Sequence, residues 1–443
     1  MTSLRLDSLA LENFRCFSGC EIAFHPRLTV LVAENGNGKT AIMDATSLAL
    51  SAYVNAIFPT EGLKKIERAD VRLALGDTKA MQPSLPTSIV ASGIVADEPL
   101  RWATAVKKYG PKVRPTTREF EGLRRATEGL RHDDALLPLV AFYGTGRLWS
   151  EHRLTDGRRT SLTNVNERLA GYSACLSSSS SFKGVSAWYE YRAKEIAAPA
   201  YRESLGTNIA LLTAVREAAR TVLEPTGWSN LDWDSQLRSL VAEHSQHGRL
   251  PLSSLSDGVR NMLALVGDVA RRCASLNPHL SGEAARQTPG ILLIDEVDMH
   301  LHPRWQQAVV ELLRTAFPSL QIVLTTHSPH VLSTVDRESI RVLRLVDSTI
   351  VAETPLLQTR GVMSADVLAS IMGVDPVPQV DEATWLSRYR AMIEDGEAES
   401  TDGRQLQERL VAHFGETHPV IAECNRLIRF QAFRIKKQPS GDS

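Results

Sequence analysis

The stretch 28–44, LTVLVAENGNGKTAIMD, joins an apolar segment to a glycine turn and then to a second apolar segment. The pattern predicts a short buried strand, a tight turn and a helix from Thr40 to Phe58. Its end matches the phosphate-binding pattern G-x-x-x-x-G-K-[ST], except that Ala33 stands at the first glycine. Small residues at a helix N-terminus let backbone N–H groups point at phosphate. Alanine costs on the order of 1 kcal/mol there only if the backbone must be left-handed.

The bulk composition is that of a soluble globular protein. With 443 residues, 43% hydrophobic and 23% charged, two or three domains are expected. No apolar run approaches the roughly 18 residues of a membrane span, and the N-terminus does not resemble a secretory signal. The cysteines are odd in number and far apart, which favours a reducing cytoplasm over a disulfide framework. They are Cys16, Cys20, Cys175, Cys273 and Cys424.

The net charge of −1 conceals local asymmetry. Residues 101–131 and 426–437 are rich in lysine and arginine, whereas 381–408 is acidic. Such runs form either a solvated face or a landing surface for nucleic acid or an acidic partner. The sequence leaves both interpretations open. The more specific one is that residues 101–131 contact DNA or RNA.

Two further apolar segments end in chemically useful side chains. ILLIDE, 291–296, predicts a buried parallel strand that ends in two acids, where Asp295 can hold Mg²⁺ through water and Glu296 can polarise an attacking water. LQIVLTTHSP predicts another such strand, with His327 at the same edge of the sheet. A lone histidine after a strand is more often structural, but this one follows an acid pair in a chain with a phosphate loop. Strands alternating with helices predict an α/β core.

The fourth element is LSDGVR, 255–260, which opens a helix before the acid pair. A Ser-x-Gly turn alone is only a helix start, yet in this order it resembles the ABC signature sequence. The whole set resembles an ABC-type ATPase of the RecF/SMC-like class. More narrowly, LENFRCF, ENGNGKT, FYGTGRLW, LSDGVR, LLIDEVDMHLHPRWQ and LTTHSP look like the ATPases typified by PtuA of Septu and retron defence. The likeness is strong over 1–60 and 250–335.

The resemblance implies an α/β, ABC-type P-loop ATPase head with an inserted mixed or helical region and a helical C-terminal tail. We expect an N-terminal lobe over 1–60, its continuation and a helical insertion over 61–250, a C-terminal lobe over 251–350 and a tail over 351–443. ATP and Mg²⁺ are the implied cofactors. The implied catalytic residues are Glu296, His327 and Lys39, and the implied metal ligands are Thr40 and Asp295. The implied nucleotide-binding residues are Arg15, Asn35, Gly36, Asn37, Gly38, Lys39, Thr40, Ala41, Ser256, Asp257, Gly258 and Asp298, of which 256–258 would act in trans across an ATP-sandwich homodimer.

Three features of the sequence differ from the family pattern or lack an expected motif. No glutamine follows PLVAFYGTGR, so we look to the turn 144–147 for a substitute of the Q-loop glutamine. His300 and His302 lack a third ligand that would make a metal site. After residue 340 there is no D-x-D pair, so we expect no Toprim nuclease in this chain.

Three functions compete. The first is a defence ATPase, slow and regulatory, that controls a partner nuclease, by resemblance of HNH type. The second is a RecF-like repair clamp on DNA, which should bind DNA without help and with strong salt dependence. The third is a scaffold that has lost hydrolysis, against which the intact Glu296 and His327 argue.

Overall fold

The computed structural model describes most of the chain. The described residues are 4–59, 63–75, 80–110, 116–118, 120–132, 135–145, 167–177, 182–197, 205–347 and 349–437. They divide into two compact units, Met1–Met372 and Gly373–Ser443.

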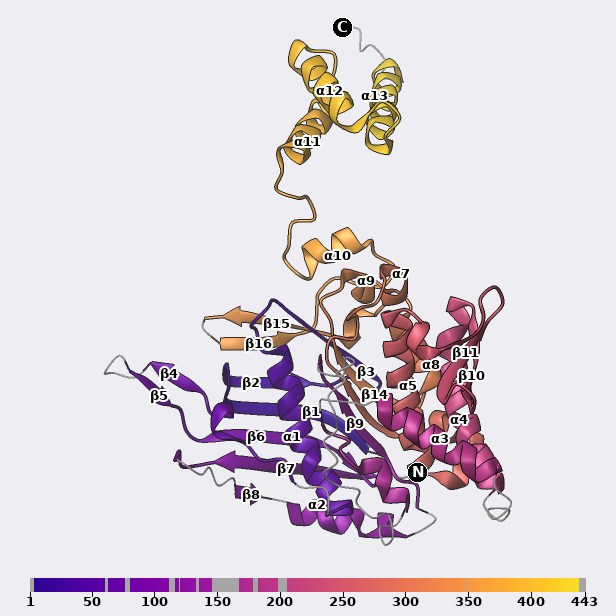
Figure 1. The fold of residues 1–443 in the computed structure, drawn as a ribbon. Helices are drawn as coiled ribbons and strands as arrows, with labels where there is room; N and C mark the ends of the chain where they lie inside the picture. Colours follow the sequence, from indigo (N-terminus) through magenta and orange to yellow (C-terminus); the bar gives the residue numbers. More distant parts are fainter. Residues whose placement is uncertain are drawn as a thin grey trace. The chain divides into compact units, whose positions relative to one another are not determined.

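A six-stranded sheet forms the centre of the first unit, in the order β16-β15-β3-β14-β13-β9 (Figure 1). Every pairing is parallel except that of β15 with β16. All residues of β3, β9, β13 and β14 are buried, as expected for parallel strands covered on both faces. The strands are β3 (Leu28–Ala33), β9 (Leu139–Tyr143), β13 (Gly290–Ile294), β14 (Leu320–Thr325), β15 (Ile340–Val346) and β16 (Thr349–Glu353).

The register brings the carboxyl ends of the central strands to one edge. Ile294 of β13 lies opposite Tyr143 of β9 and Leu324 of β14, and Thr325 lies opposite Leu31 of β3. The phosphate loop, the acid pair and the segment with His327 each follow one of these strands. Side chains far apart in sequence therefore lie together at this edge.

Helix α1 (Lys39–Ile57) lies between the central sheet and a second, antiparallel sheet (Figure 1). The second sheet has the order β2-β1-β6-β7-β8. Its longest strand alternates buried and less buried residues, because one face packs on the core. The strands are β1 (Leu4–Phe14), β2 (Phe17–Ala23), β6 (Thr87–Val95), β7 (Glu98–Val106) and β8 (Thr116–Arg118), and a hairpin of β4 (Leu73–Leu75) and β5 (Met81–Pro83) precedes β6.

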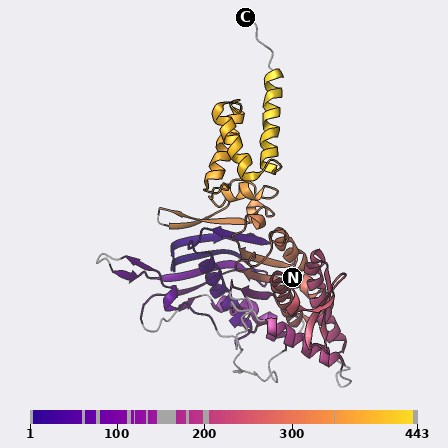
Figure 2. The same ribbon diagram turned by 45° about the horizontal axis from the view of Figure 1, so that its top comes forward.

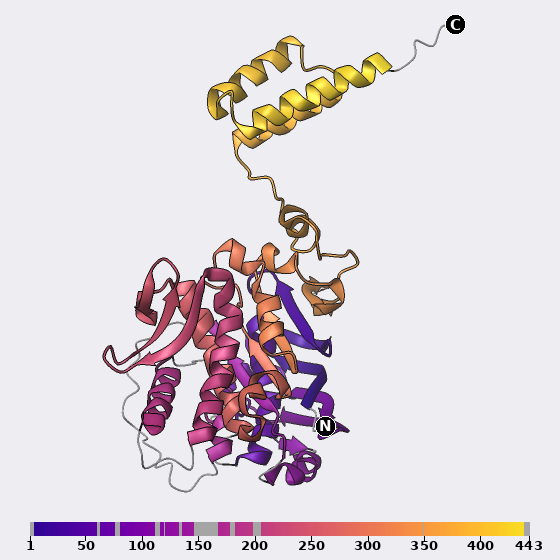
Figure 3. The same cartoon turned by 90° about the vertical axis from the view of Figure 1, so that its right-hand side faces the viewer.

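The inserted region contains a three-stranded sheet that the sequence analysis did not predict. Strands β10 (Trp228–Asp234), β11 (Ser239–His244) and β12 (Gly248–Pro251) pair in that order, and helix α4 (Leu205–Leu223) packs beside them (Figure 3). These strands are short and mostly polar, so their sequence carries little periodic apolar signal. The other helices of the region up to β13 are α2 (Phe120–Thr127), α3 (Phe182–Ala197), α5 (Asp257–Leu276) and α6 (Ala284–Gln287).

The segment 304–318, RWQQAVVELLRTAFP, forms two helices, although its sequence pattern predicts a single one. Helix α7 (Pro303–Gln306) ends and α8 (Val309–Ala316) begins around Ala308, whose N–H donates to the carbonyl of Trp305 only three residues back. This tightened turn interrupts the α-helical bonding. Two more short helices follow, α9 (Pro329–Leu332) and α10 (Ser364–Ser370).

The second unit contains three helices around a small apolar cluster of its own (Figure 2). The helices are α11 (Asp381–Glu394), α12 (Thr401–Phe414) and α13 (Pro419–Lys437). The α/β head with a helical C-terminal region is therefore confirmed, whereas the division into the four predicted segments stays a prediction. Among the described helices, none combines the length and apolar character that a membrane crossing requires.

Candidate active site

The turn between β3 and α1 has the backbone of a phosphate-binding loop. Gly36 and Gly38 have φ values of 87° and 85°, in the left-handed region that favours glycine. Ala33, in contrast, is the last residue of β3 and pairs with Leu343 in the sheet. Because its backbone is extended, the alanine at this position carries no conformational penalty. The one departure from the loop pattern is structurally neutral.

Lys39 begins α1 and is buried, with its ammonium held by the loop. Its Nζ donates to the carbonyl of Ala33 at 2.8 Å and to that of Glu34 at 3.4 Å. Burial lowers the pKa of Lys39, and the charges of the acids after β13 act in the opposite direction. The loop therefore holds a cation beside its backbone N–H groups.

A continuous hydrogen-bonded chain joins the loop to the ends of β13 and β14. The hydroxyl of Thr40 donates to Asp295 Oδ2 at 3.1 Å, and the hydroxyl of Thr325 donates to Asp295 Oδ1 at 2.6 Å. The N–H of Glu296 then donates to the Thr325 hydroxyl at 2.7 Å. Asp295 is almost fully buried, at 1% exposed. Each oxygen of this carboxylate is thus oriented by a threonine, one from the first turn of α1 and one from the end of β14.

Glu296 has a left-handed backbone, with φ of 49°. A non-glycine residue in this conformation costs on the order of 1 kcal/mol and needs support from its surroundings. That support comes from the Thr325 hydroxyl and from the next residue, Val297, whose N–H donates to the Thr325 carbonyl at 3.0 Å. The half-buried Glu296 is therefore placed by the end of the neighbouring strand.

The next acid and the histidine lie on the same edge. The Thr326 hydroxyl donates to Asp298 Oδ1 at 2.5 Å, and half-buried His327 follows directly. Beyond them, the Ser328 hydroxyl caps α9 and donates to the side chain of Gln306. Short polar contacts thus hold the turns after β13 and β14 together.

Arg15 lies in the turn between β1 and β2 and is bound by two carboxylates. Its guanidinium contacts Asp44 Oδ2 at 2.6 Å and Asp70 Oδ1 at 2.8 Å. Asp44 is one helical turn beyond Thr40, so this ion pair lies at the loop end of α1. The same turn and the start of β2 lie against Gly38, because a Cβ at Gly38 would meet Cys16 Sγ at 2.7 Å and the Phe17 ring at 2.5 Å.

The predicted signature segment lies at the start of α5. Ser256 and Asp257 are exposed, and Asp257 forms an ion pair with Arg260. A Cβ at Gly258 would lie 3.0 Å from the carbonyl of His300, so this helix start packs against the turn that follows Asp298. Within the described residues, no hydrogen bond or ion pair joins 256–258 to the phosphate loop. Of the remaining predicted loop residues, Asn35 and Asn37 lie on either side of Gly36, and Ala41 is the third residue of α1.

Several contacts of the site were not predicted from sequence. Thr325, Thr326, Asp44 and Asp70 orient the predicted residues, and the only local signal was the threonine pair before His327. Of the turn expected to replace the Q-loop glutamine, Gly144 and Thr145 follow β9 and residues 146–147 lie outside the described residues. No group of three or more histidine, cysteine, aspartate or glutamate side chains forms a metal cluster among the residues described.

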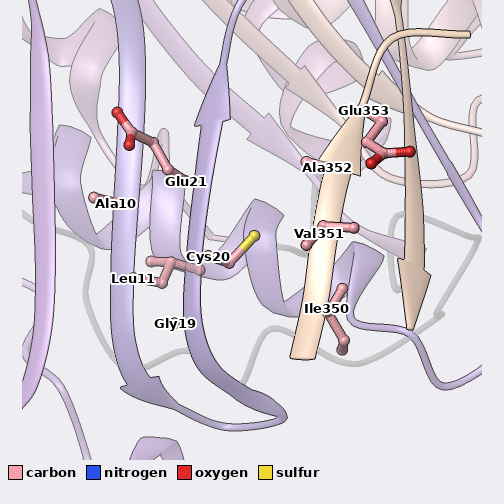
Figure 4. Close-up of a pocket in the computed structure, with 9 residues that line it drawn as sticks. All are labelled: Ala10, Leu11, Gly19, Cys20, Glu21, Ile350, Val351, Ala352 and Glu353. Carbon is pink, nitrogen blue, oxygen red and sulfur yellow. The ribbon is translucent and has the colours of Figure 1, made fainter. Parts of the chain in front are cut away.

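Two surface features lie apart from these residues. Of the basic segment, Arg101, Lys107, Lys108, Arg124 and Arg125 are exposed on or next to β7 and α2, while 111–115 lies outside the described residues. An open groove of about 570 Å³ is lined by residues of β1, β2 and β16, Cys20 and Glu21 among them (Figure 4). None of the predicted site residues lines that groove.

Comparison with known proteins agrees with this arrangement. One family model, described as an AAA domain, matches residues 8–185, and a second, described as AAA domain, putative AbiEii toxin, Type IV TA system, matches 224–333. The Retron Vc95 probable ATPase of Vibrio cholerae is 23% identical, over 93% of this chain and 88% of its own length. Septu protein PtuA of Bacillus mycoides is 41% identical over 18% of this chain and 10% of its own length.

The chain is similar to retron probable ATPases along most of its length and to Septu PtuA over part of it. The resemblance expected from the motifs is confirmed, and the AAA matches together with the retron relative support ATPase activity. An SMC head solved in complex with the C-winged helix domain of ScpA matches 79% of this chain and 98% of its own, with 14% identity and a TM-score of 0.50. That likeness concerns the fold alone, and it confirms the SMC-like head.

Proposed function

We propose that this chain is the ATPase subunit of a cytoplasmic anti-phage defence system and that it controls a partner nuclease of HNH type. The observation that carries the proposal is the hydrogen-bonded chain from Thr40 through Asp295 and Thr325 to Glu296. It links a phosphate loop to a candidate general base. Similarity to a retron ATPase along nearly the whole chain supports the defence context.

The donor set fits ATP with Mg²⁺. Two glycines with left-handed backbones and a buried lysine suit a triphosphate, and a hydroxyl 3.1 Å from a carboxylate oxygen supplies the oxygen ligands that Mg²⁺ prefers. Thr40 and Asp295 would hold the ion, which would neutralise charge on the phosphates.

Hydrolysis would then depend on the chain's own side chains. Lys39 stabilises negative charge on the phosphates, and Glu296 orients a water and accepts its proton. His327, at the end of the next strand, would contact the transferred phosphate. Asp295 is positioned by Thr325 at 2.6 Å, which keeps it oriented toward Thr40.

A homodimer would complete the site. Ser256, Asp257 and Gly258 would bind the nucleotide of a second copy, and Asp298 would lie close to that interface. An exposed helix N-terminus with its free backbone N–H groups suits an anion from outside the chain. We propose that the partner nuclease senses whether this dimer is closed, so turnover is slow and regulatory.

The assigned roles of Glu296 and Lys39 make opposite predictions for two substitutions. Glu296→Gln should lower turnover at least about 100-fold, because the general base is lost, while ATP stays bound and the dimer stays closed. Lys39→Ala should prevent ATP binding altogether. Bound nucleotide and molar mass in solution, measured with and without ATP, test both substitutions. Wild-type turnover by Glu296→Gln would disprove the assignment of the base.

The defence role is tested by co-expressing the tagged chain with its neighbouring genes and purifying it with and without ATP. A small nuclease recovered at a fixed stoichiometry, whose activity changes with ATP, is the expected result. A chain that returns alone, yet shifts duplex DNA with ATP and loses that binding steeply with salt, would favour the RecF-like clamp instead. The exposed basic residues of the 101–131 segment are the surface to substitute in that case.

A further inference from the structure

A buried carboxylate lies in the middle of α5, the helix that begins at the signature segment. Asp268 is 4% exposed. Its Oδ1 accepts hydrogen bonds from Arg271 at 2.9 and 2.6 Å, and its Oδ2 accepts from Arg272 at 2.9 Å and from the hydroxyl of Tyr143 at 2.8 Å. A buried carboxylate with this many donors is fully satisfied.

The two arginines alone account for the charge of Asp268. Burial by itself would raise the pKa of Asp268, but Arg272 and Arg271 outweigh burial and hold that pKa well below its usual range. Nη1 of Arg272 also donates to the carbonyls of Gly171 and Ser173, at 2.8 and 2.9 Å, which fixes the guanidinium beside Asp268. The Tyr143 hydroxyl is thus not required to neutralise this group.

Tyr143 instead connects the end of β13 to α5, the first through its backbone and the second through its side chain. It is the last residue of β9 and is 1% exposed. Its backbone carbonyl accepts the N–H of Asp295 at 2.8 Å, and its side-chain hydroxyl donates to Asp268 on α5. Burial raises the pKa of Tyr143 well above its usual value, so the hydroxyl keeps the proton that it donates.

The contact lies far along the helix from the signature segment. Asp268 follows Ser256 by twelve residues, which corresponds to about 18 Å along a helix axis. A helix is stiff over this length, so a small tilt at Asp268 displaces its N-terminus. A contact at Asp268 therefore acts on where Ser256 and Gly258 lie relative to Asp295, together with the packing of Gly258 against the carbonyl of His300.

We propose that Tyr143 is a positioning residue that couples the signature helix α5 to the end of the strand carrying Asp295, through its hydrogen bond to buried Asp268. The inference rests on the proposed ATP-sandwich dimer. In it, Tyr143 does not touch nucleotide. It aligns the N-terminus of α5, which each chain presents to the nucleotide of its partner, with the carboxylate edge of its own sheet.

The test is Tyr143→Phe, which removes one hydroxyl and keeps the ring. The matched control is Tyr172→Phe, since Tyr172 is also fully buried and donates its hydroxyl to a backbone carbonyl, that of Pro138, at the opposite end of β9. We expect Tyr143→Phe to lower kcat about tenfold with ATP affinity of the monomer unchanged, as loss of one hydrogen bond to a charged group predicts. Tyr172→Phe should leave kcat within about twofold, although it too loses a buried hydrogen bond and should lower the thermal midpoint.

A dimer of two different variants shows whether the Tyr143 hydroxyl acts in the chain that supplies the signature segment or in the chain that supplies the phosphate loop. One chain carries Lys39→Ala and supplies only the signature segment, and the other carries Ser256→Arg and supplies only the phosphate loop. Adding Tyr143→Phe to the signature donor should reduce the rate of the mixture. Adding it to the loop donor should not, because the backbone carbonyl that binds Asp295 is unchanged. An equal loss in both arrangements, or a loss only in the loop donor, would overturn the positioning role.

The two proposals fail in different ways. If the wild-type chain neither hydrolyses ATP nor dimerises with it, the proposed function is wrong and the role of Tyr143 falls with it. If the wild type does both and Tyr143→Phe matches Tyr172→Phe in rate and in ATP-dependent dimerisation of the Glu296→Gln background, only the positioning role is wrong.

Discussion

At the scale of single residues, the phosphate loop depends on contacts made by a turn elsewhere in the chain. A Cβ at Gly38 would lie 2.5 Å from the Phe17 ring and 2.7 Å from Cys16 Sγ, both in the β1–β2 region. At Gly36, which has nearly the same φ, a Cβ would meet nothing within 4 Å. Both positions therefore require a glycine backbone conformation, but only Gly38 also requires the absence of a side chain for packing.

We predict that Gly38→Ala damages the loop more than Gly36→Ala does. Both substitutions place alanine at a φ near +85°, at a cost on the order of 1 kcal/mol. Only Gly38→Ala must also displace Phe17 or Cys16, so its ATP affinity should fall at least about tenfold further. Titration of each variant with ATP, with urea unfolding as the check on stability, distinguishes them. Equal losses would mean that the packing of the β1–β2 region against Gly38 does not matter.

At the scale of elements, the antiparallel sheet supports the helix that begins at the loop. Trp102 of β7 is 2% exposed, and its indole N–H donates to the carbonyl of Ala49 in α1 at 2.9 Å. That carbonyl belongs to the helix interior, so the bond adds to the helix's own. The sheet thereby restrains α1 about ten residues beyond Lys39.

We predict that Trp102→Phe lowers the free energy of unfolding by roughly 1–3 kcal/mol, because it leaves a cavity and removes a buried hydrogen bond. Trp228→Phe is the control, since Trp228 is only partly buried, on the three-stranded sheet. Its cost should stay below about 1 kcal/mol. Equilibrium urea unfolding measures both values. A loss for Trp228→Phe as large as that for Trp102→Phe would contradict the assigned importance of the contact with α1.

At the scale of the whole molecule, the chain comprises two units that each have their own apolar cluster. Val367 and Ile371 of the segment around α10 belong to the core of the first unit. Tyr389, Leu410 and Ile421 belong to the cluster of the three-helix unit. The division after Met372 therefore coincides with a division of the buried apolar surface.

We predict that residues 1–372 fold and bind ATP without the rest of the chain. Residues 1–339 should not fold, because they lack β15, which pairs with β3 directly before the phosphate loop. Circular dichroism and ATP titration of the two fragments compare them. An unfolded 1–372 fragment would show that the first unit requires 373–443 for its stability.

The strands, the loop and the order of the acids were predictable from sequence because they depend on local information. A run of buried apolar residues with a glycine turn, or with acids at its end, is complete within ten residues, and parallel strands bring such ends to one edge. The ends of β3, β13 and β14 could thus be predicted from residues 28–44, 291–296 and the stretch before His327. The break in the helix at Ala308 and the strands β10–β12 could not be predicted, because they depend on tertiary contacts and on pairing with other strands.

The sequence by itself determined which residue types stand at the edge of the sheet and in what order. Only the tertiary structure decided how they are held: Asp295 by Thr40 and Thr325, Arg15 by Asp44 and Asp70, and Asp268 by Tyr143. Each of these contacts joins residues at least 29 positions apart, the shortest being that of Arg15 with Asp44. Hydrogen bonds require specific distances and angles, which depend on strand order and register rather than on the neighbouring sequence.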